Sequence, residues 1–285
     1  MPYTHYLQSW LKGYGQIMLQ SSSLTGLLFL LGIGLNSVPM LLGALLGGFI
    51  ATLTGNLLRT PNALHQGLHG FNGALVGIAG VFFLQPSVAS FCLIAICTIS
   101  ATLLTHTLQR SSLPGFTAPF VITTWVMLSA APLLGIPTAE LPTLQSDLPQ
   151  LSTTFLGIGQ VMFQGELIAG LCFVLGLILS NWRHAALALT GSTLGCCAIL
   201  ISGVSEALVA NGLYSFNPAL TAIALGTSAS QFPVLRVVTG IALSVLFTHL
   251  FVLADLPSLT APFILATWTV LELERLIRSS SSASI

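Results

Sequence analysis

Charge is the scarcest property of this sequence. Charged residues make up only 5% of the 285 positions, and seven basic and seven acidic side chains give a formal net charge of zero. Soluble domains carry roughly 25% charged residues, because they need groups that water solvates on their surface. The composition therefore excludes a soluble globular fold, and the lack of a basic excess argues against nucleic acid as a partner.

Signatures of catalysis and of cofactor or metal binding are also missing from the sequence. It has no phosphate-binding loop, dinucleotide fingerprint, nucleophile elbow or Cys/His spacing suited to a metal. The five cysteines form no CxxC pair, so we expect them to be small apolar residues of helices. No series of charged residues runs through the apolar segments, as ion channels and secondary active transporters usually require. We expect a protein that is not an enzyme and that needs neither cofactor nor metal.

Apolar residues, by contrast, fill 54% of the positions, and the mean hydropathy is +0.94. At about 20 residues per helical crossing, the chain has room for on the order of ten transmembrane helices. The sequence therefore predicts an all-α membrane protein. Ten apolar runs separated by polar breaks cover residues 22–35, 38–55, 71–84, 87–109, 117–134, 166–181, 184–202, 216–230, 233–253 and 260–275.

The chain also repeats itself at an offset of 143 to 145 residues. Three colinear matches at nearly one offset indicate two homologous halves. The matching pairs are residues 13–20 with 157–164, residues 67–79 with 212–224, and residues 105–125 with 248–268.

The repeat and the prolines divide the chain into four parts. We place the first membrane half at residues 1–135 and the second at 155–278. Residues 136–154 read as a proline-rich linker outside the cytoplasm, and residues 279–285 as a disordered serine-rich tail.

Each half is expected to hold five crossings and one re-entrant helix. Moderately apolar residues 61–70 lead into the short run 71–84, which indicates a re-entrant segment followed by a short or tilted span. With the amino terminus inside, this count puts all seven basic residues and both termini on the cytoplasmic side. An odd number of spans per half inverts the second half, as in many transporters and channels. The basic residues are Lys12, Arg59, Arg110, Arg183, Arg236, Arg275 and Arg278.

Polar residues that recur in both halves are candidates for lining a pathway. Gln16 and Gln160 each precede the first apolar run of their half, and Leu19 or Phe163 follows three residues later. A glutamine amide offers both a donor and an acceptor to a solute. The alternative is that each glutamine only ties down a loop.

A Phe-Asn motif recurs where each re-entrant segment meets the short span after it. We expect Asn72 and Asn217 to cap the backbone there, and Phe71 and Phe216 to be either core residues or the walls of a slot. Glycines around the first copy, and a proline in the second, indicate irregular backbone with carbonyls that need partners. A permeating donor could supply them. These carbonyls belong to Leu68, His69, Leu213 and Tyr214.

Thr117 and Thr260 form the third recurring pair, each in Thr-Ala-Pro-Phe at the start of a run. Each threonine is either only an N-cap or one of two hydroxyls near the centre of a pathway. His106 and His249 come late in long runs, away from the Phe-Asn break, so helix packing is favoured over an ammonium or proton path. Glu166 starts a helix, where a carboxylate is favoured, and is a candidate mouth residue.

Together these motifs resemble the urea transporter family, in its bacterial branch. They are Gln-x-x-Leu/Phe, Gly-Leu-His-Gly-Phe-Asn-Gly, Ser-Phe-Asn-Pro-Ala-Leu-Thr-Ala and the repeated Thr-Ala-Pro-Phe, and the resemblance covers residues 12 to 278. It implies a passive, channel-type facilitator of urea, with analogues such as formamide as further solutes. It also implies a bacterial inner-membrane homotrimer with a pore at the pseudo-two-fold axis within each protomer.

The resemblance assigns roles residue by residue. Gln16 and Gln160 match the polar side chains of the two mouth sites, although relatives can carry Glu at one of them. Thr117 and Thr260 match the central hydroxyls, and the carbonyls before each Phe-Asn match the oxygen ladders. The slot walls match Leu19, Phe163, Phe71, Leu75, Phe216 and Leu220.

Three other functions stay open. A channel for water or another small neutral solute would explain Asn217-Pro218-Ala219, the aquaporin tripeptide, but the first half lacks the proline and no filter arginine is present. An ammonia channel would use the two histidines, although the chain is short for that family. A structural membrane protein without a pathway would leave the re-entrant segments without a purpose.

Overall fold

The computed structural model describes residues 3–58, 60–144, 150–201, 203–227, 230 and 233–282. These residues form fourteen α-helices and one 3₁₀-helix. Their only β-type pairing is an isolated bridge between Leu84 and Thr138. The predicted all-α membrane fold is confirmed.

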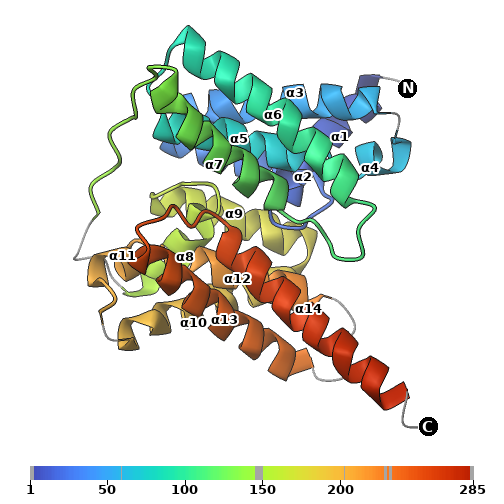
Figure 1. Ribbon diagram of the computed structural model, residues 1–285, viewed down its shortest axis with the longest axis vertical. Coiled ribbons are helices and arrows are strands. Elements are labelled where there is room, and N and C mark those ends of the chain that lie inside the picture. Colours follow the sequence, from blue (N-terminus) through green and yellow to red (C-terminus); the bar gives the residue numbers. More distant parts are fainter. Residues whose placement is uncertain are drawn as a thin grey trace.

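The helices of the two halves follow one another in the same order, and Figure 1 shows them as two groups stacked one on the other. The first half holds α1 (Tyr3–Gln16), α2 (Ser23–Asn36), α3 (Val38–Leu57), α4 (Pro61–His65), α5 (Gly70–Phe83), α6 (Val88–Leu108) and α7 (Ala118–Leu133). The second holds α8 (Gln150–Gln160), α9 (Leu167–Ser180), α10 (Trp182–Gly195), η1 (Cys196–Leu200), α11 (Glu206–Ala210), α12 (Phe216–Gly226), α13 (Pro233–Leu253) and α14 (Ala261–Ser282).

Each of the ten apolar runs overlaps a helix, but two further helices of more than ten residues were not expected. These are α1 and α8, whose sequences are too polar to be recognised as apolar runs. Because α8 begins at Gln150, the last residues assigned to the linker belong to a helix. At the other end α14 continues to Ser282, through serines that were expected to be disordered. One of them, Ser279, donates its hydroxyl to the Leu276 carbonyl one turn earlier, at 2.8 Å.

Three described helices, α3, α6 and α13, are long and apolar enough to cross a membrane. Five shorter apolar helices accompany them, namely α2, α5, α7, α9 and α12. The outward faces are also apolar: Leu27, Leu31 and Leu35 on α2 and Leu42 and Phe49 on α3 are exposed. Faces of this kind suit contact with lipid. The number of crossings and the inversion of the second half stay predictions.

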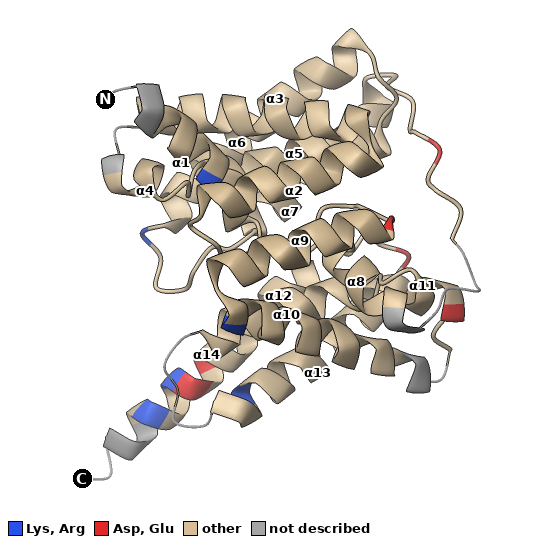
Figure 2. Ribbon diagram, turned by 180° about the vertical axis from the view of Figure 1, so that it is seen from behind, with Lys and Arg blue, Asp and Glu red and all other residues tan. Residues whose placement is uncertain are grey.

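The charged residues are few and unevenly placed. In Figure 2 the blue basic residues gather toward one end of the helices, and most red acidic residues lie toward the other. One of the seven basic residues, Arg59, lies outside the described residues, and so does the acidic Asp147. This separation agrees in sense with the positive-inside rule, while the side of the membrane on which each end lies stays a prediction.

Side-chain caps fix where several helices begin. Ser22 and Ser37 accept hydrogen bonds from the first turns of α2 and α3, and Asn181 does the same for α10. Ser87 and Ser90 form a reciprocal capping box at the start of α6. Such caps satisfy backbone N–H groups that have no partner inside the helix.

Glycines allow α3 and α5 to pack backbone against backbone. Gly43 and Gly47 on α3 face Gly73 and Gly77 on α5, with four-residue spacing on both helices. A Cβ added at Gly47 would lie 2.1 Å from the Gly73 carbonyl oxygen, so only glycine fits. This is the small-residue packing that close helices in membranes use. It buries α5 completely from residue 70 to residue 80, which holds the Phe-Asn motif rigidly.

The two halves meet through α2 and α9. The rings of Phe29 and Phe173 lie 4.9 Å apart between their centroids, and both are fully buried. Thr25 donates its hydroxyl to the Gly176 carbonyl oxygen at 2.9 Å. The core is therefore continuous from one half to the other, and a site between the halves can be held by both.

Candidate functional site

Thr117 and Thr260 come from opposite halves and meet. Their Oγ1 atoms are 2.7 Å apart, and the residues are only 3% and 2% exposed. Thr117 is the N-cap residue of α7, yet its hydroxyl makes no cap hydrogen bond to that helix. The hydroxyl forms a hydrogen bond with Thr260 of the opposite half instead, so capping is not the reason for a threonine at this position.

The backbone before each threonine is strained in the same way. Phe116 has φ 44° and Leu259 has φ 46°, in the left-handed region that bulky side chains rarely occupy. Strain of this kind, about 1–3 kcal/mol, persists only where the surrounding structure imposes it. Its recurrence in both halves marks the two breaks as built features of the fold.

Asn72 and Asn217 hold these breaks in place. Their Oδ1 atoms accept from the backbone N–H of Phe120 and of Phe263, each at 3.2 Å. Their Nδ2 atoms donate to the carbonyl oxygens on the other side of the breaks, at 3.3 Å for Phe116 and 3.1 Å in the second half. Both asparagines bind backbone groups, as expected. These groups belong to the Thr-Ala-Pro-Phe segment and not to the Phe-Asn motif in which each asparagine stands.

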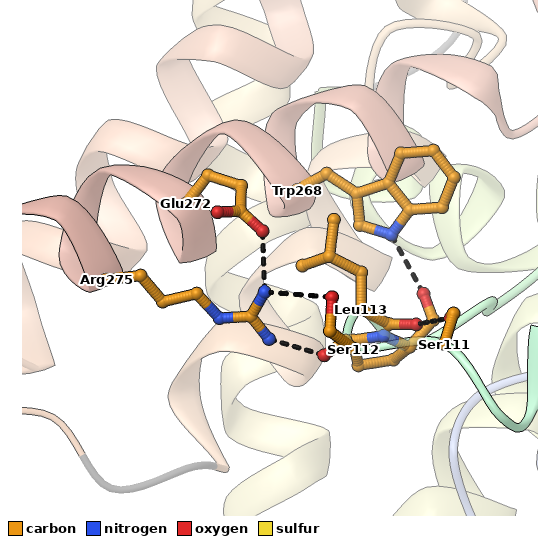
Figure 3. Close-up of polar contacts among 7 residues, drawn as sticks. Ser111, Ser112, Leu113, Trp268, Glu272 and Arg275 are labelled. Carbon is orange, nitrogen blue, oxygen red and sulfur yellow. Dashed lines mark hydrogen bonds and ion pairs between the residues drawn. The ribbon is translucent and has the colours of Figure 1, made fainter.

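Two tryptophans brace the same breaks from the opposite half. Trp125 donates its Nε1–H to the Pro257 carbonyl at 2.9 Å, and Trp268 donates to the Pro114 carbonyl at 2.8 Å. Figure 3 shows the Trp268 ring turned toward the loop that carries residues 111–113. The sequence repeat includes both tryptophans, and that recurrence is the signal that could have identified them.

Gln16 and Gln160 are the last residues of α1 and α8, and they bind the backbone of the segments that lead into the two Phe-Asn motifs. The Nε2 of Gln16 donates to the Gln66 carbonyl at 2.8 Å, and that of Gln160 donates to the Asn211 carbonyl at 3.1 Å. Both glutamines are partly buried. The contact agrees with the alternative in which each glutamine ties down a loop.

Three of the four carbonyls that follow these anchors are without a partner outside the helices. Among the described residues, no hydrogen bond outside the helical ladders ends on the carbonyl oxygen of Leu68, Leu213 or Tyr214. His69 is the N-cap residue of α5, so its carbonyl faces the first turn of that helix. The turns are set by Gly67 with φ 78° and its counterpart Gly212 with φ 77°. Backbone carbonyls left without partners in a helical protein are available to a bound or passing donor.

Leu19 and Phe163 occupy tight turns after α1 and α8, with φ 61° and φ 60°. Both are partly buried. The Phe163 ring belongs to an aromatic group, with its centroid 5.0 Å from that of Phe82 and 6.4 Å from that of Phe120. Leu19 provides no ring, so the two halves differ at this position.

Phe71 is the second residue of α5 and Phe216 is the first residue of α12, and Leu75 and Leu220 follow one turn later. The two phenylalanines are each 8% exposed and the leucines are buried. This burial is compatible with core residues, and their place as slot walls belongs to the proposal below.

Sequence reasoning missed a second pair of glutamines, Gln20 and Gln164. Both are buried and belong to the same repeated motif as Gln16 and Gln160. The Oε1 of Gln20 lies 3.0 Å from His184 Nδ1, and the Oε1 of Gln164 accepts from Asn36 Nδ2 at 2.7 Å. Each turn is therefore held by a residue of the opposite half.

The expectation that His106 and His249 lie away from the Phe-Asn break is wrong. The Tyr214 hydroxyl and His249 Nδ1 are 3.0 Å apart, and the rings of His69 and His106 lie 6.3 Å apart. Both histidines therefore pack on the residues that lead into the breaks, because the long helices α6 and α13 run back past α5 and α12. Glu166 is exposed and makes no side-chain cap at α9.

Comparison with known proteins identifies the family that the chain is similar to. The family model described as "Urea transporter" matches residues 7–275. Urea transporter 1 of Ovis aries is 29% identical to the chain, over 90% of the chain and 74% of the relative. Urea transporter 1 of Rattus norvegicus is 27% identical with the same coverage, and that of Mus musculus is 29% identical.

Proposed function

Because the chain belongs to the urea transporter family, we propose that it conducts urea passively across a membrane, down the urea gradient. The observation that carries the proposal is the meeting of Thr117 and Thr260 between the halves. Two breaks, each strained and braced from the opposite half, bring these hydroxyls together at the point where a pathway along the pseudo-two-fold axis would be narrowest.

Urea enters at the mouths through amide groups. It is planar and neutral, with two NH₂ donors and one carbonyl acceptor, so a glutamine side chain can bind either end of it. Gln16 and Gln160 serve these two sites. Their anchoring to the Gln66 and Asn211 carbonyls suits a loop-holding role, and it also holds each amide two residues before the first ladder carbonyl, Leu68 or Leu213, which supports the proposal.

The oxygen ladder then replaces the water that urea loses. A buried donor without a partner costs about 1–3 kcal/mol, so stripping urea of water would be slow in an apolar slot. The carbonyls of Leu68 and His69 in one half, and of Leu213 and Tyr214 in the other, accept from the urea NH₂ groups. The lack of hydrogen bonds outside the helical ladders at Leu68, Leu213 and Tyr214, among the described residues, supports this role.

The slot selects by shape and by lack of charge. Phe71 and Phe216, with leucines one turn later and the residues of the tight turns, flank the flat faces of urea. An ion entering between these side chains loses its hydration and meets no opposite charge, which is prohibitive. At the centre, each threonine hydroxyl can both donate and accept. Urea can therefore replace the hydrogen bond between the two hydroxyls by hydrogen bonds to itself.

The orientation and assembly are further parts of the proposal. The family resemblance supports a pore in each protomer of a homotrimer in a bacterial inner membrane. The separation of basic from acidic residues supports cytoplasmic termini and an inverted second half.

Stopped-flow light scattering on proteoliposomes tests the function. The vesicles are mixed with a hyperosmotic urea solution in one run and with a hyperosmotic solution of an impermeant solute in another. Urea flow and water flow are thus measured on the same vesicles. We expect fast, saturable urea relaxation with low water and ion leak. Urea entry no faster than in empty vesicles would overturn the proposal, and fast water flow beside it would favour a water channel.

A further inference from the structure

A cavity of about 440 Å³ lies next to one of the two breaks, outside the filter described above. Its wall on one side is the loop before α7, through Ser112 and Phe116, and on the other side α13 and α14. Phe116 is the strained residue that immediately precedes Thr117. The cavity is therefore in contact with the segment that positions the central hydroxyl.

Its lining is basic, which is unusual in this chain. The described residues that line it include Arg236, Arg275 and Arg278, against a single carboxylate, Glu274. The whole chain has only seven basic residues, so three of them border one cavity. With Glu272 paired to Arg275 beside the cavity, three arginines stand against two carboxylates, and the remaining positive charge is what an anion would require.

One of these arginines is buried. Arg236 is 5% exposed, and its Nε lies 3.3 Å from Glu274 Oε1. Ser230 donates its hydroxyl to the same carboxylate oxygen at 2.7 Å. A buried guanidinium is costly unless it is paired, and Glu274 provides this pairing for Arg236.

Arg275 is held in a fixed orientation at the rim, as Figure 3 shows. Its Nη1 lies 2.6 Å from Glu272 Oε1 and donates to Ser112 Oγ at 3.4 Å, while Nη2 donates to the Ser112 carbonyl oxygen. The side chain thus connects α14 to the loop before α7. A guanidinium held in this way loses little further freedom when it binds a ligand.

The other half has no such cluster. At the repeat offset of 143, the counterparts of the three arginines are Leu93, Pro132 and Gly135, and that of Glu274 is Ala131. The repeat therefore does not impose the charges. They are specific to this end of the chain, which the positive-inside rule assigns to the cytoplasmic side.

We propose that this cavity binds a phosphate-type oxyanion through Arg236, Arg275 and Arg278. Guanidinium groups bind phosphate oxygens with paired, charge-assisted hydrogen bonds, and basic pockets on the cytoplasmic side of helix bundles bind anionic headgroups. The phosphate belongs either to a lipid or to a free ion in solution. In both cases the bound anion stabilises the loop that carries Phe116.

Thermal unfolding of the purified protein tests the proposal independently of urea transport. One arm, in a neutral detergent, compares inorganic phosphate with sodium chloride at equal ionic strength. The other arm uses protein reconstituted into vesicles of phosphatidylcholine, with and without phosphatidylglycerol. We expect the unfolding temperature to rise in one arm, and the arm that responds identifies the source as a free ion or a lipid.

Charge variants decide whether the cavity is responsible. Arg278→Gln removes an exposed arginine of the lining and should weaken the apparent affinity about tenfold or more. Arg183→Gln is the matched control, because Arg183 is exposed on α10 and does not line the cavity. No stabilisation in either arm overturns the proposal, and so does an equal loss in the two variants. Arg236→Gln, if it folds, should abolish binding.

Discussion

The hydroxyl oxygens of Thr117 and Thr260 lie 2.7 Å apart although the residues are 143 positions apart in the chain. Each hydroxyl comes from a break in its own half that is strained at φ and braced by an asparagine of the same half and a tryptophan of the other. Neither threonine can change without affecting the group opposite it.

Replacing Thr117 by valine should slow urea flux about tenfold without unfolding the protein. The variant keeps the shape of the side chain but leaves the Thr260 hydroxyl and the passing urea one partner short, at a cost of about 1–3 kcal/mol. Stopped-flow urea permeability in proteoliposomes measures the effect. Thr123→Val is the control, since that buried hydroxyl on α7 bonds only backbone of its own helix. Wild-type flux in Thr117→Val would remove Thr117 from the central site.

Replacing Asn217 by alanine should destabilise the protein by about 2–4 kcal/mol. The side chain makes two buried hydrogen bonds across the break before α14, and both backbone partners would be left unsatisfied. Chemical or thermal unfolding in detergent measures the loss. Asn62→Ala, an exposed asparagine of α4, should change stability by less than about 0.5 kcal/mol. A variant as stable as wild type would show that the break holds its shape without this bridge.

His69→Tyr should give the first half a hydrogen bond that, among the described residues, only the second half has. Tyr214 reaches His249 Nδ1 at 3.0 Å, whereas the shorter His69 leaves its own Nδ1 and that of His106 buried without a partner. We expect His69→Tyr to be more stable than His69→Phe by about 1 kcal/mol, because the phenol hydroxyl reaches His106. The comparison removes the shared loss of the His69 bond to Thr60.

The same pair in a His106→Phe background provides the check, measured by unfolding in detergent. There the advantage of tyrosine over phenylalanine should disappear. An advantage that persists would mean that the hydroxyl bonds elsewhere.

Gly47→Val should prevent α3 and α5 from packing. Its Cβ would lie 2.1 Å from the Gly73 carbonyl oxygen, and a backbone atom cannot move aside as a flexible side chain can. We expect loss of folded protein in detergent by size-exclusion chromatography. Gly34→Ala is the control on α2, where the nearest neighbour is the flexible end of Leu41. Normal yield and stability of Gly47→Val would contradict the close approach of the two helices.

The prediction of helices from sequence failed in instructive places. Helices α1 and α8 are too polar to be recognised by hydropathy, yet their buried faces pack on the rest of their halves, and Gln16 and Gln160 end them. The α14 helix also continues into serines that read as disordered, because the backbone bonds of a helix do not depend on side-chain hydropathy. Apolar runs indicate segments that are buried in lipid or in the core, and they do not identify helices of mixed composition.

The sequence by itself determined the class, the repeat and the recurring polar pairs. The lack of charge leaves a membrane as the only medium for this chain, and a repeat needs no structure to be recognised. Only the tertiary structure decided which members of the pairs meet. The Thr117–Thr260 bond, the bridging by Asn217 and the approach of His249 to Tyr214 join residues far apart in sequence. Such contacts depend on helix packing set by many small residues at once, and no local pattern encodes them.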